Sequence, residues 1–270
     1  MLRVWRPSGQ ELAPVSAEEF KDAAALKEHL REVYGFPFSL QQLMHEGNLL
    51  EGCAELDAPM DLQLVLLTIS GLSPSDKTAR FAEAELADAA RRNCEKVARY
   101  LLEAGVGADR RDDAGKTFLM LASRNGHLEV ARLLLEAGAK KDLEDGCGQT
   151  ALMFASWYGH REVVRALLEA GADKNHIDNQ CQTALMFAST SGHVKVARLL
   201  LEARAETYCQ DMCGMTALMQ AAARGQLEIA RLLLEARAAK HIADEDGRTA
   251  AMLASEHGHQ EVARLLEAGV

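Results

Sequence analysis

The chain has 270 residues, of which 48% are apolar and 26% charged, and its formal net charge is −10. This composition is that of a globular protein, and the acidic balance without a dense run of Lys or Arg argues against a nucleic-acid groove. No stretch approaches the roughly 20 apolar residues that a membrane span needs, and residues 1–15 lack the apolar core of a signal peptide. We expect a soluble cytoplasmic protein, with the nucleus as the alternative compartment.

The first 69 residues predict a small mixed sheet with one helix. Residues 2–6 ("LRVWR") alternate apolar and polar side chains as a half-buried strand does, and residues 11–15 ("ELAPV") are placed to return as a second strand. Apolar residues then follow a helical spacing from Phe20 to Val33, and Gly35 ends the pattern. Two strand-like runs come next, "LQQLMHEGNLL" at 40–50 and "MDLQLVLLTI" at 60–69. The predicted order is therefore ββαββ.

The runs "GFPFSLQQLMHEGNLLEG" (35–52) and "DLQLVLL" (61–67) resemble the ubiquitin-like β-grasp family. The resemblance implies an α+β fold over residues 1–69. It also implies that Met44 and Val65 correspond to the apolar patch that ubiquitin receptors contact, with Gln63 beside them where the family has His. The alternative is that Met44 is ordinary strand packing. The chain continues past Leu67 without a terminal Gly-Gly, so it resembles a built-in ubiquitin-like domain rather than a conjugated modifier.

A change of composition follows this segment. All five prolines lie before residue 75, and residues 1–75 carry eleven acidic against five basic side chains. The segment 70–82 ("SGLSPSDKTARFA"), rich in Ser with a Gly and a Pro, is predicted to be a linker. We expect a multidomain chain with a domain at 1–69, the linker at 70–82 and a second domain at 83–270.

The second domain is periodic. Three residue types recur every 33 residues: Asp at 112, 145, 178, 211 and 244, Thr at 117, 150, 183, 216 and 249, and His at 127, 160, 193 and 259, with Gln at 226. A period of 33 residues is typical of a stacked helical solenoid, because a single unit cannot bury its apolar face alone.

Each repeat contains the signals of a turn and two helices. The stretch "DDAGKT" predicts a turn that ends in Thr117, whose hydroxyl can cap a helix. In "HLEVARLLLEAG" the apolar residues form one stripe, and Gly138 suits a left-handed helix end. These motifs resemble the ankyrin repeat family, which implies an all-α solenoid over residues 83–270. It has an N-terminal cap at 83–111 and repeats starting near 112, 145, 178, 211 and 244.

The chain departs from the family pattern at two kinds of position. Met stands in place of the motif His, and Cys181, Arg204 and Arg237 stand where Gly is expected. We predict that the Met side chains pack in the turn. If the backbone stays left-handed at these positions, each non-Gly residue should destabilise the folded state by about 1 kcal/mol.

Two positions vary between otherwise identical stretches, "TALMFASWYGH" at 150–160 and "TALMFASTSGH" at 183–193. The resemblance implies that these two residues end the inner helix of each repeat and face a groove. We call them the groove pairs and propose them as partner-binding residues: Arg124, Asn125, Trp157, Tyr158, Thr190, Ser191, Ala223, Arg224, Glu256 and His257. Trp, Tyr and Arg are common interface hot spots. The alternative is that Trp157 and Tyr158 only pack on the neighbouring turn.

The projecting turns form a second candidate contact surface, which we call the fingertips. They are Lys116, Gln149, Asn179, Gln180, Gln182, Met212, Met215, Glu245, Asp246 and Arg248.

Nothing in the sequence predicts an enzyme, a cofactor or a metal site. The repeated histidines would lie about 8–10 Å apart in stacked repeats, whereas a shared metal requires about 2 Å, so we expect them to bond turn backbone. Cys209 and Cys213 lack a second ligand pair, and the six cysteines suggest reduced thiols. No phosphate-binding loop or nucleophile motif is present.

The sequence therefore predicts a non-catalytic adaptor. Its groove would bind a protein client, while the N-terminal domain would contact ubiquitin receptors or the proteasome; no nucleic acid or membrane partner is expected. Two alternatives remain: a general interaction scaffold without a ubiquitin-pathway role, and an enzyme whose motifs are not recognisable.

Overall fold

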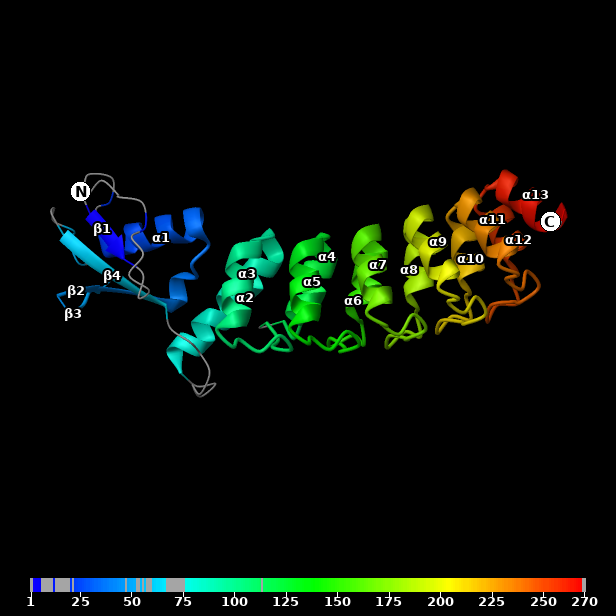
Figure 1. Cartoon of the computed structure of the whole chain (residues 1–270). Helices are drawn as coiled ribbons and strands as arrows, with labels where there is room; N and C mark the ends of the chain where they lie inside the picture. The colour runs from blue at the N-terminus through cyan, green and yellow to red at the C-terminus, as the bar shows by residue number, and fades with distance from the viewer. Residues whose placement is uncertain are drawn as a thin grey trace. The chain divides into compact units, whose positions relative to one another are not determined.

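The computed structural model describes residues 2–5, 12, 20, 22–46, 48–51, 54, 56, 60–66, 76–112 and 114–268. The chain divides into two compact units, Met1–Arg110 and Arg111–Val270. Figure 1 shows the first unit in blue and cyan and the second from green to red. Among the described residues, no helix is both long and apolar enough to cross a bilayer.

The first unit is built around a four-stranded sheet. Its strands are β1 (Leu2–Trp5), β2 (Gln41–His45), β3 (Asn48–Leu49) and β4 (Met60–Leu66), in the order β1-β4-β2-β3. Strand β1 runs parallel to β4, and both other pairs are antiparallel. Alternation decides which face is buried, since Leu62 and Leu64 are buried while Gln63 between them is exposed.

Helix α1 (Ala23–Tyr34) covers the buried face of this sheet. Asp22 caps its first turn, and Gly35 ends it with a left-handed φ of 75°. Its buried residues, with those of the strands, form one core: Val4, Leu12, Ala23, Leu26, Leu30, Phe36, Leu43, Leu56, Leu62 and Leu64. The layered arrangement is compatible with a ubiquitin-like β-grasp without establishing it. Most of the second strand expected at 11–15 lies outside the described residues, but the Leu12 amide donates to the Val4 carbonyl (2.8 Å).

Two further helices belong to the first unit, α2 (Lys77–Arg92) and α3 (Glu95–Glu103). Helix α2 therefore begins inside the segment 70–82 that was expected to be a linker. A short 3-10 helix, η2 (Phe38–Leu40), contacts α2, and the Tyr100 ring of α3 lies 5.2 Å from that of Phe36. The sheet and the first helix pair thus pack together.

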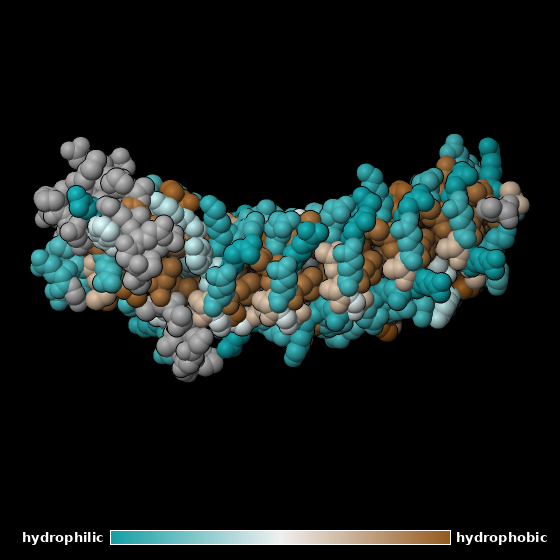
Figure 2. All heavy atoms as spheres, viewed as in Figure 1, coloured by the Kyte–Doolittle hydropathy of each residue, from teal (hydrophilic) through white to brown (hydrophobic). Residues whose placement is uncertain are grey.

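The second unit contains five helix pairs among the described residues. They are α4 (Phe118–Asn125) with α5 (Leu128–Glu136), α6 (Ala151–Tyr158) with α7 (Arg161–Glu169), α8 (Ala184–Ser191) with α9 (Val194–Glu202), α10 (Ala217–Ala223) with α11 (Leu227–Glu235), and α12 (Ala250–Glu256) with α13 (Gln260–Ala268). Figure 1 shows the pairs side by side, with the turns projecting on one side of the stack. Buried Ala, Val and Leu side chains fill the stack, and Figure 2 shows hydrophilic bands alternating with hydrophobic ones.

The recurrent Asp organises each projecting turn. Asp145 Oδ1 accepts hydrogen bonds from the amides of Cys147 (2.9 Å) and Gln149 (3.0 Å), and the other four repeats make the equivalent pair of bonds. An Asp side chain that bonds amides two and four residues ahead closes the turn without help from other segments. This geometry explains why Asp recurs with the same period as Thr.

The recurrent Thr caps the inner helices as predicted, except at one position. The hydroxyls of Thr117, Thr183, Thr216 and Thr249 accept the amide of the Met three residues later. Thr150 makes no such bond. The Met side chains pack in the turn as expected in four repeats. Met252, in the repeat that begins near Asp244, is the exception because it is exposed.

Candidate protein-binding surface of the repeat stack

The groove pairs end the inner helices α4, α6, α8, α10 and α12 or directly follow them. Trp157 and Tyr158, the last residues of α6, are each 44% exposed. The Trp157 ring stacks on that of Phe187 in the next repeat, with centroids 5.0 Å apart and planes 13° from parallel. Trp157 therefore packs on the inner helix of the next repeat rather than on the neighbouring turn, and it remains partly exposed; its role in partner binding stays a prediction.

A cationic side chain extends this aromatic surface toward the N-terminus. The Arg124 guanidinium lies 5.5 Å from the centre of the Tyr158 ring, within the range of a cation–π contact. The rings of Trp157 and Tyr158 lie 6.2 Å apart. Arg124, Tyr158, Trp157 and Phe187 thus form a continuous row across three repeats, which we call the aromatic row.

The recurrent histidines hold the backbone of this row. His160 Nε2 lies 2.9 Å from the Arg124 carbonyl oxygen, and His193 Nε2 lies 2.9 Å from that of Trp157. The histidines were expected to bond turn backbone, whereas these two bond helix carbonyls. Their partner is the last turn of the preceding inner helix, so these two repeats each fix the backbone of the groove pair in the repeat before.

The C-terminal half of the groove is polar. A cavity of about 400 Å³ opens there, lined by predicted groove residues (Thr190, Arg224, His257) and predicted fingertip residues (Gln182, Met215, Arg248), among others. The structure therefore brings the two sets together around one hollow.

A buried amide organises the floor of that cavity. Gln220 Nε2 donates to Asp211 Oδ2 (2.9 Å), and the Thr190 hydroxyl donates to Gln220 Oε1 (2.7 Å). Arg224 is exposed at the rim, and no carboxylate of the described residues lies within ion-pair distance of it. This half of the groove can therefore offer an arginine to an anionic group.

Other groove residues are already engaged within the chain. Asn125 is exposed and donates to the Leu121 carbonyl (2.7 Å), and Glu256 lies 3.9 Å from Arg248. His257 Nδ1 lies 2.8 Å from the Leu253 carbonyl. Ser191 is partly exposed beside Thr190.

Several fingertips hold neighbouring turns together. Lys116 Nζ donates to Asp145 of the next repeat (2.8 Å) and lies 4.6 Å from the centre of the Phe154 ring. Gln149 reaches Asp178 at 3.5 Å, and Asn179 Nδ2 donates to the Gly146 carbonyl at 3.3 Å. Met212 is the most exposed apolar side chain of the fingertips. The remaining members of the set also lie between the helices: Gln180, Gln182, Met215, Glu245, Asp246 and Arg248.

Sequence reasoning missed two groove residues, Phe187 and Gln220. They share one repeat position with Phe154, which the two nearly identical stretches present as invariant. Comparison with "TALMQAAARGQ" at 216–226 shows that this position varies as well. The change from Phe to Gln marks the point where the groove turns from aromatic to polar.

On the first unit, the strand register brings the predicted patch together. Met44 pairs with Gln63, and Gln42 pairs with Val65, so these side chains share the face of the sheet opposite Leu43 and Leu64. Gln63 is exposed, and Met44 and Val65 are partly exposed.

The described residues contain no cluster of three or more potential metal ligands. Cys94, Cys147, Cys181, Cys209 and Cys213 are free thiols. The pKa of Cys209 is raised above its ordinary value, chiefly by burial of the thiol and secondly by the neighbouring Glu206.

A comparison with protein families identifies the repeat architecture. A search of curated proteins found no match. The family model described as ankyrin repeats (3 copies) matches residues 61–145, 86–178, 138–211 and 203–270. The matches together cover more than half of the chain, and ankyrin repeats are protein–protein interaction modules that are generally non-catalytic. On the repeat period, the helix-pair stack and this match, the chain belongs to the ankyrin repeat family.

Proposed function

We propose that this protein is a non-catalytic scaffold that binds a protein partner along the groove pairs of its repeat stack. The observation that carries the proposal is the aromatic row, in which Trp157 stacks on Phe187 while the residue remains 44% exposed. A rigid, partly exposed Trp beside Tyr and Arg has the composition of an interface hot spot.

The two halves of the groove indicate the chemistry of the partner. The aromatic row suits an apolar or aromatic side chain, and Arg224 at the rim of the polar cavity suits a carboxylate. A partner segment that carries both, separated by the length of about two repeats, would match the surface.

The experiment is a quantitative affinity capture with the full chain as bait, in extract from cells that make the protein. Proteins retained by the wild type are compared with those retained by Trp157→Ala/Tyr158→Ala. For a retained partner, we expect an affinity loss of at least about 30-fold, since hot-spot truncations cost about 2 kcal/mol or more.

A matched control separates the groove from the rest of the stack. Arg198→Ala changes an exposed residue on the outer helix α9, whose contact to Glu228 is only a weak pair at 3.9 Å. Binding should be unchanged in this variant. A partner that is lost equally from both variants, or from neither, would contradict the proposal.

A second, finer proposal concerns the first unit. We propose that Met44, Gln63 and Val65 contact ubiquitin receptors, which would make the protein a ubiquitin-pathway adaptor. Support comes from the sequence resemblance and from the strand register that puts the three side chains on one face. An NMR titration of the full chain with a ubiquitin-receptor domain would test it. We expect saturable chemical-shift changes at these three residues, and we expect Met44→Glu to abolish them. If the wild type shows no such changes, the chain would be a general scaffold.

A further inference from the structure

A second hollow lies within the first unit. A cavity of about 780 Å³ opens between helix α2 and the β2–β3 edge of the sheet. Three of its lining residues from separate elements are large, apolar and solvent-exposed: Phe38 at 40%, Leu49 at 56% and Phe81 at 67%. Clustered exposed apolar side chains mark interaction sites on soluble proteins.

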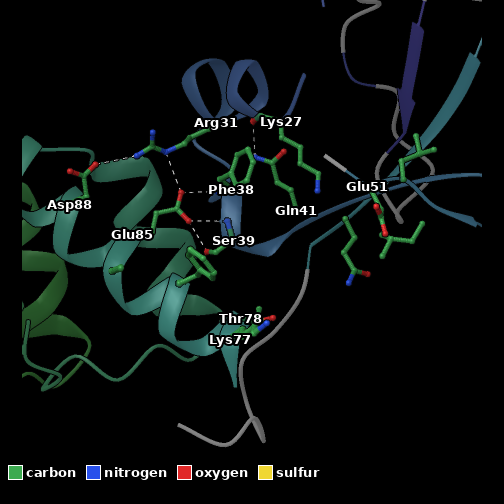
Figure 3. A pocket seen from close by; sticks show the side chains of 15 residues that line it. Lys27, Arg31, Phe38, Ser39, Gln41, Glu51, Lys77, Thr78, Glu85 and Asp88 are labelled. Carbon is green, nitrogen blue, oxygen red and sulfur yellow. Dashed lines mark hydrogen bonds and ion pairs between the residues drawn. The ribbon is translucent and has the colours of Figure 1, made fainter. Parts of the chain in front are cut away.

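Most charged groups at one end of the cavity are paired with each other. Glu85 accepts hydrogen bonds from the amides of Phe38 (2.7 Å) and Ser39 (3.0 Å) and from the Ser39 hydroxyl (2.6 Å). Arg31 forms ion pairs with Glu85 (3.2 Å) and Asp88 (3.3 Å), and Figure 3 shows these bonds as dashed lines. Asp88 also pairs with Arg92 (2.8 Å), so both carboxylates of this polar cluster have a cationic partner within the chain.

Two ammonium groups are left over. Lys27 is partly buried beside Phe38, with its Nζ 5.8 Å from the ring centre, and Lys77 is exposed at the start of α2. In the part of the chain that the structure describes, no carboxylate lies within ion-pair distance of either one. Burial without a counter-charge lowers the pKa of Lys27. Glu51, also exposed on the lining, is the acidic residue outside the polar cluster, so the unpaired charges favour an anion.

The exposure of the walls indicates the size of the occupant. Small-molecule sites enclose most of the surface of their ligand, whereas Phe81 and Leu49 lie largely open to solvent. An open apolar surface with charges at its border is better covered by a length of polypeptide.

We propose that this groove binds a short peptide segment of a partner protein in which a large apolar side chain stands next to an Asp or Glu. The apolar side chain packs against Phe38 and Phe81, and the positive charges of Lys27 and Lys77 attract the carboxylate. The site is separate from the groove pairs and does not depend on the function proposed for them.

Selection from a random 12-residue peptide library displayed on phage, with the immobilised full chain as target, tests this directly. Enriched sequences should contain Asp or Glu within two positions of Phe, Trp, Leu or Met. Measured by fluorescence polarisation, enriched synthetic peptides should lose about tenfold or more in affinity for Phe81→Asp and for Lys27→Gln/Lys77→Gln. Lys195→Glu, an exposed change on α9, should have no effect.

Three results would overturn the proposal: no enrichment, enriched peptides without an acidic residue, or peptides whose binding survives in both variants. Peptides that are lost instead with Trp157→Ala/Tyr158→Ala would belong to the repeat groove, and would support the proposed function while contradicting this one. If no peptide is enriched but dodecanoate binds and shifts the NMR resonances of Phe81, the hollow would be a small-molecule site. Phe81→Ser serves as a second variant if Phe81→Asp fails to give the wild-type thermal melt.

Discussion

His193 Nε2 lies 2.9 Å from the carbonyl oxygen of Trp157, one repeat earlier in the chain. Because a carbonyl oxygen can only accept, Nε2 carries the proton and donates it. The repeat that begins near Asp178 thus holds the backbone at Trp157, a groove residue of the preceding repeat. Recurrence of His at this position therefore serves both the stack and the surface that it presents.

Replacing Gly159 tests that coupling. A Cβ at this position would lie 2.6 Å from His193 Nδ1, so Gly159→Ala must displace the imidazole. The lost hydrogen bond and the overpacking together should lower the free energy of unfolding by about 2 kcal/mol beyond backbone strain. Urea unfolding would measure this loss, and Trp157 fluorescence should change in the folded state.

Gly258→Ala provides the matched comparison. Its φ of 78° is close to the 80° of Gly159, but an added Cβ would meet nothing within 4 Å. The two variants therefore share the backbone strain and differ only in the contact with His193. Equal destabilisation would show that the histidine contact contributes nothing.

Arg204→Gly should stabilise the protein. Arg204 adopts a φ of 61°, the left-handed conformation that costs a non-Gly residue about 1–2 kcal/mol. Part of this gain is offset by the greater freedom of Gly in the unfolded chain, so we expect a net increase of about 0.5–1 kcal/mol, read as a higher Tm. Gly138, at the same repeat position with a φ of 84° and open space around it, should show the reverse effect when changed to Ala. A lower Tm for Arg204→Gly would contradict this account.

The pKa of Asp145 in the folded protein leads us to predict that stability depends on pH. Burial opposes its ionisation, but hydrogen bonds from Lys116 and from the amides of Gln149 and Cys147 outweigh burial and lower the pKa of Asp145 below its ordinary value. A depressed folded-state pKa adds stability that is complete above the unfolded-state pKa of about 3.9 and is lost as the pH falls through the folded-state value.

Asp145→Asn isolates that charge, since the amide oxygen can still accept the two turn hydrogen bonds. Urea unfolding between about pH 6 and pH 2.5 should therefore show a smaller acid-induced loss in Asp145→Asn than in the wild type. Glu129→Gln, an exposed change on α5, should keep the wild-type slope. Identical slopes in all three proteins would remove Asp145 from the explanation.

Glu85 should be essential for the contact between the sheet and α2. Its side chain is 10% exposed, accepts three hydrogen bonds and pairs with Arg31, so Glu85→Ala leaves two amides without their acceptor and removes one of the carboxylates that pair with Arg31. We expect a loss of about 3 kcal/mol and faster hydrogen exchange at Phe38 and Ser39. Glu83 lies on the same helix and forms a more exposed ion pair with Arg110. Glu83→Ala should therefore lower the free energy of unfolding by less than about 1 kcal/mol.

Much of the repeat stack could be predicted because its determinants are local. The Asp turn, the Thr cap and the left-handed positions depend on residues within one repeat, and the period shows them five times. Arg204, Arg237 and Cys181 were expected in left-handed backbone from their alignment with Gly, and their φ values of 61°, 62° and 58° confirm this.

Contacts between distant segments could not be predicted in the same way. Glu85 and Ser39 are 46 residues apart, and no spacing rule links a carboxylate on one helix to the amides of a 3-10 turn. The stacking of Phe187 on Trp157 depends on how two repeats pack, and residue spacing within one repeat does not reveal it. The start of α2 at Lys77 was hidden by the Ser-rich composition of the preceding residues.

The central claim is that a protein partner lies on the Trp157–Tyr158 surface, and site-specific photo-crosslinking tests it most directly. A benzophenone side chain is placed at Ser191, the position equivalent to Tyr158 in the next repeat, and separately at Arg198 on the outer helix α9. In cells that make the protein, the account predicts a discrete crosslinked product from position 191 that is absent from position 198 and disappears with Trp157→Ala/Tyr158→Ala. A product at 191 that persists in this double variant, or no product from position 191, would contradict it.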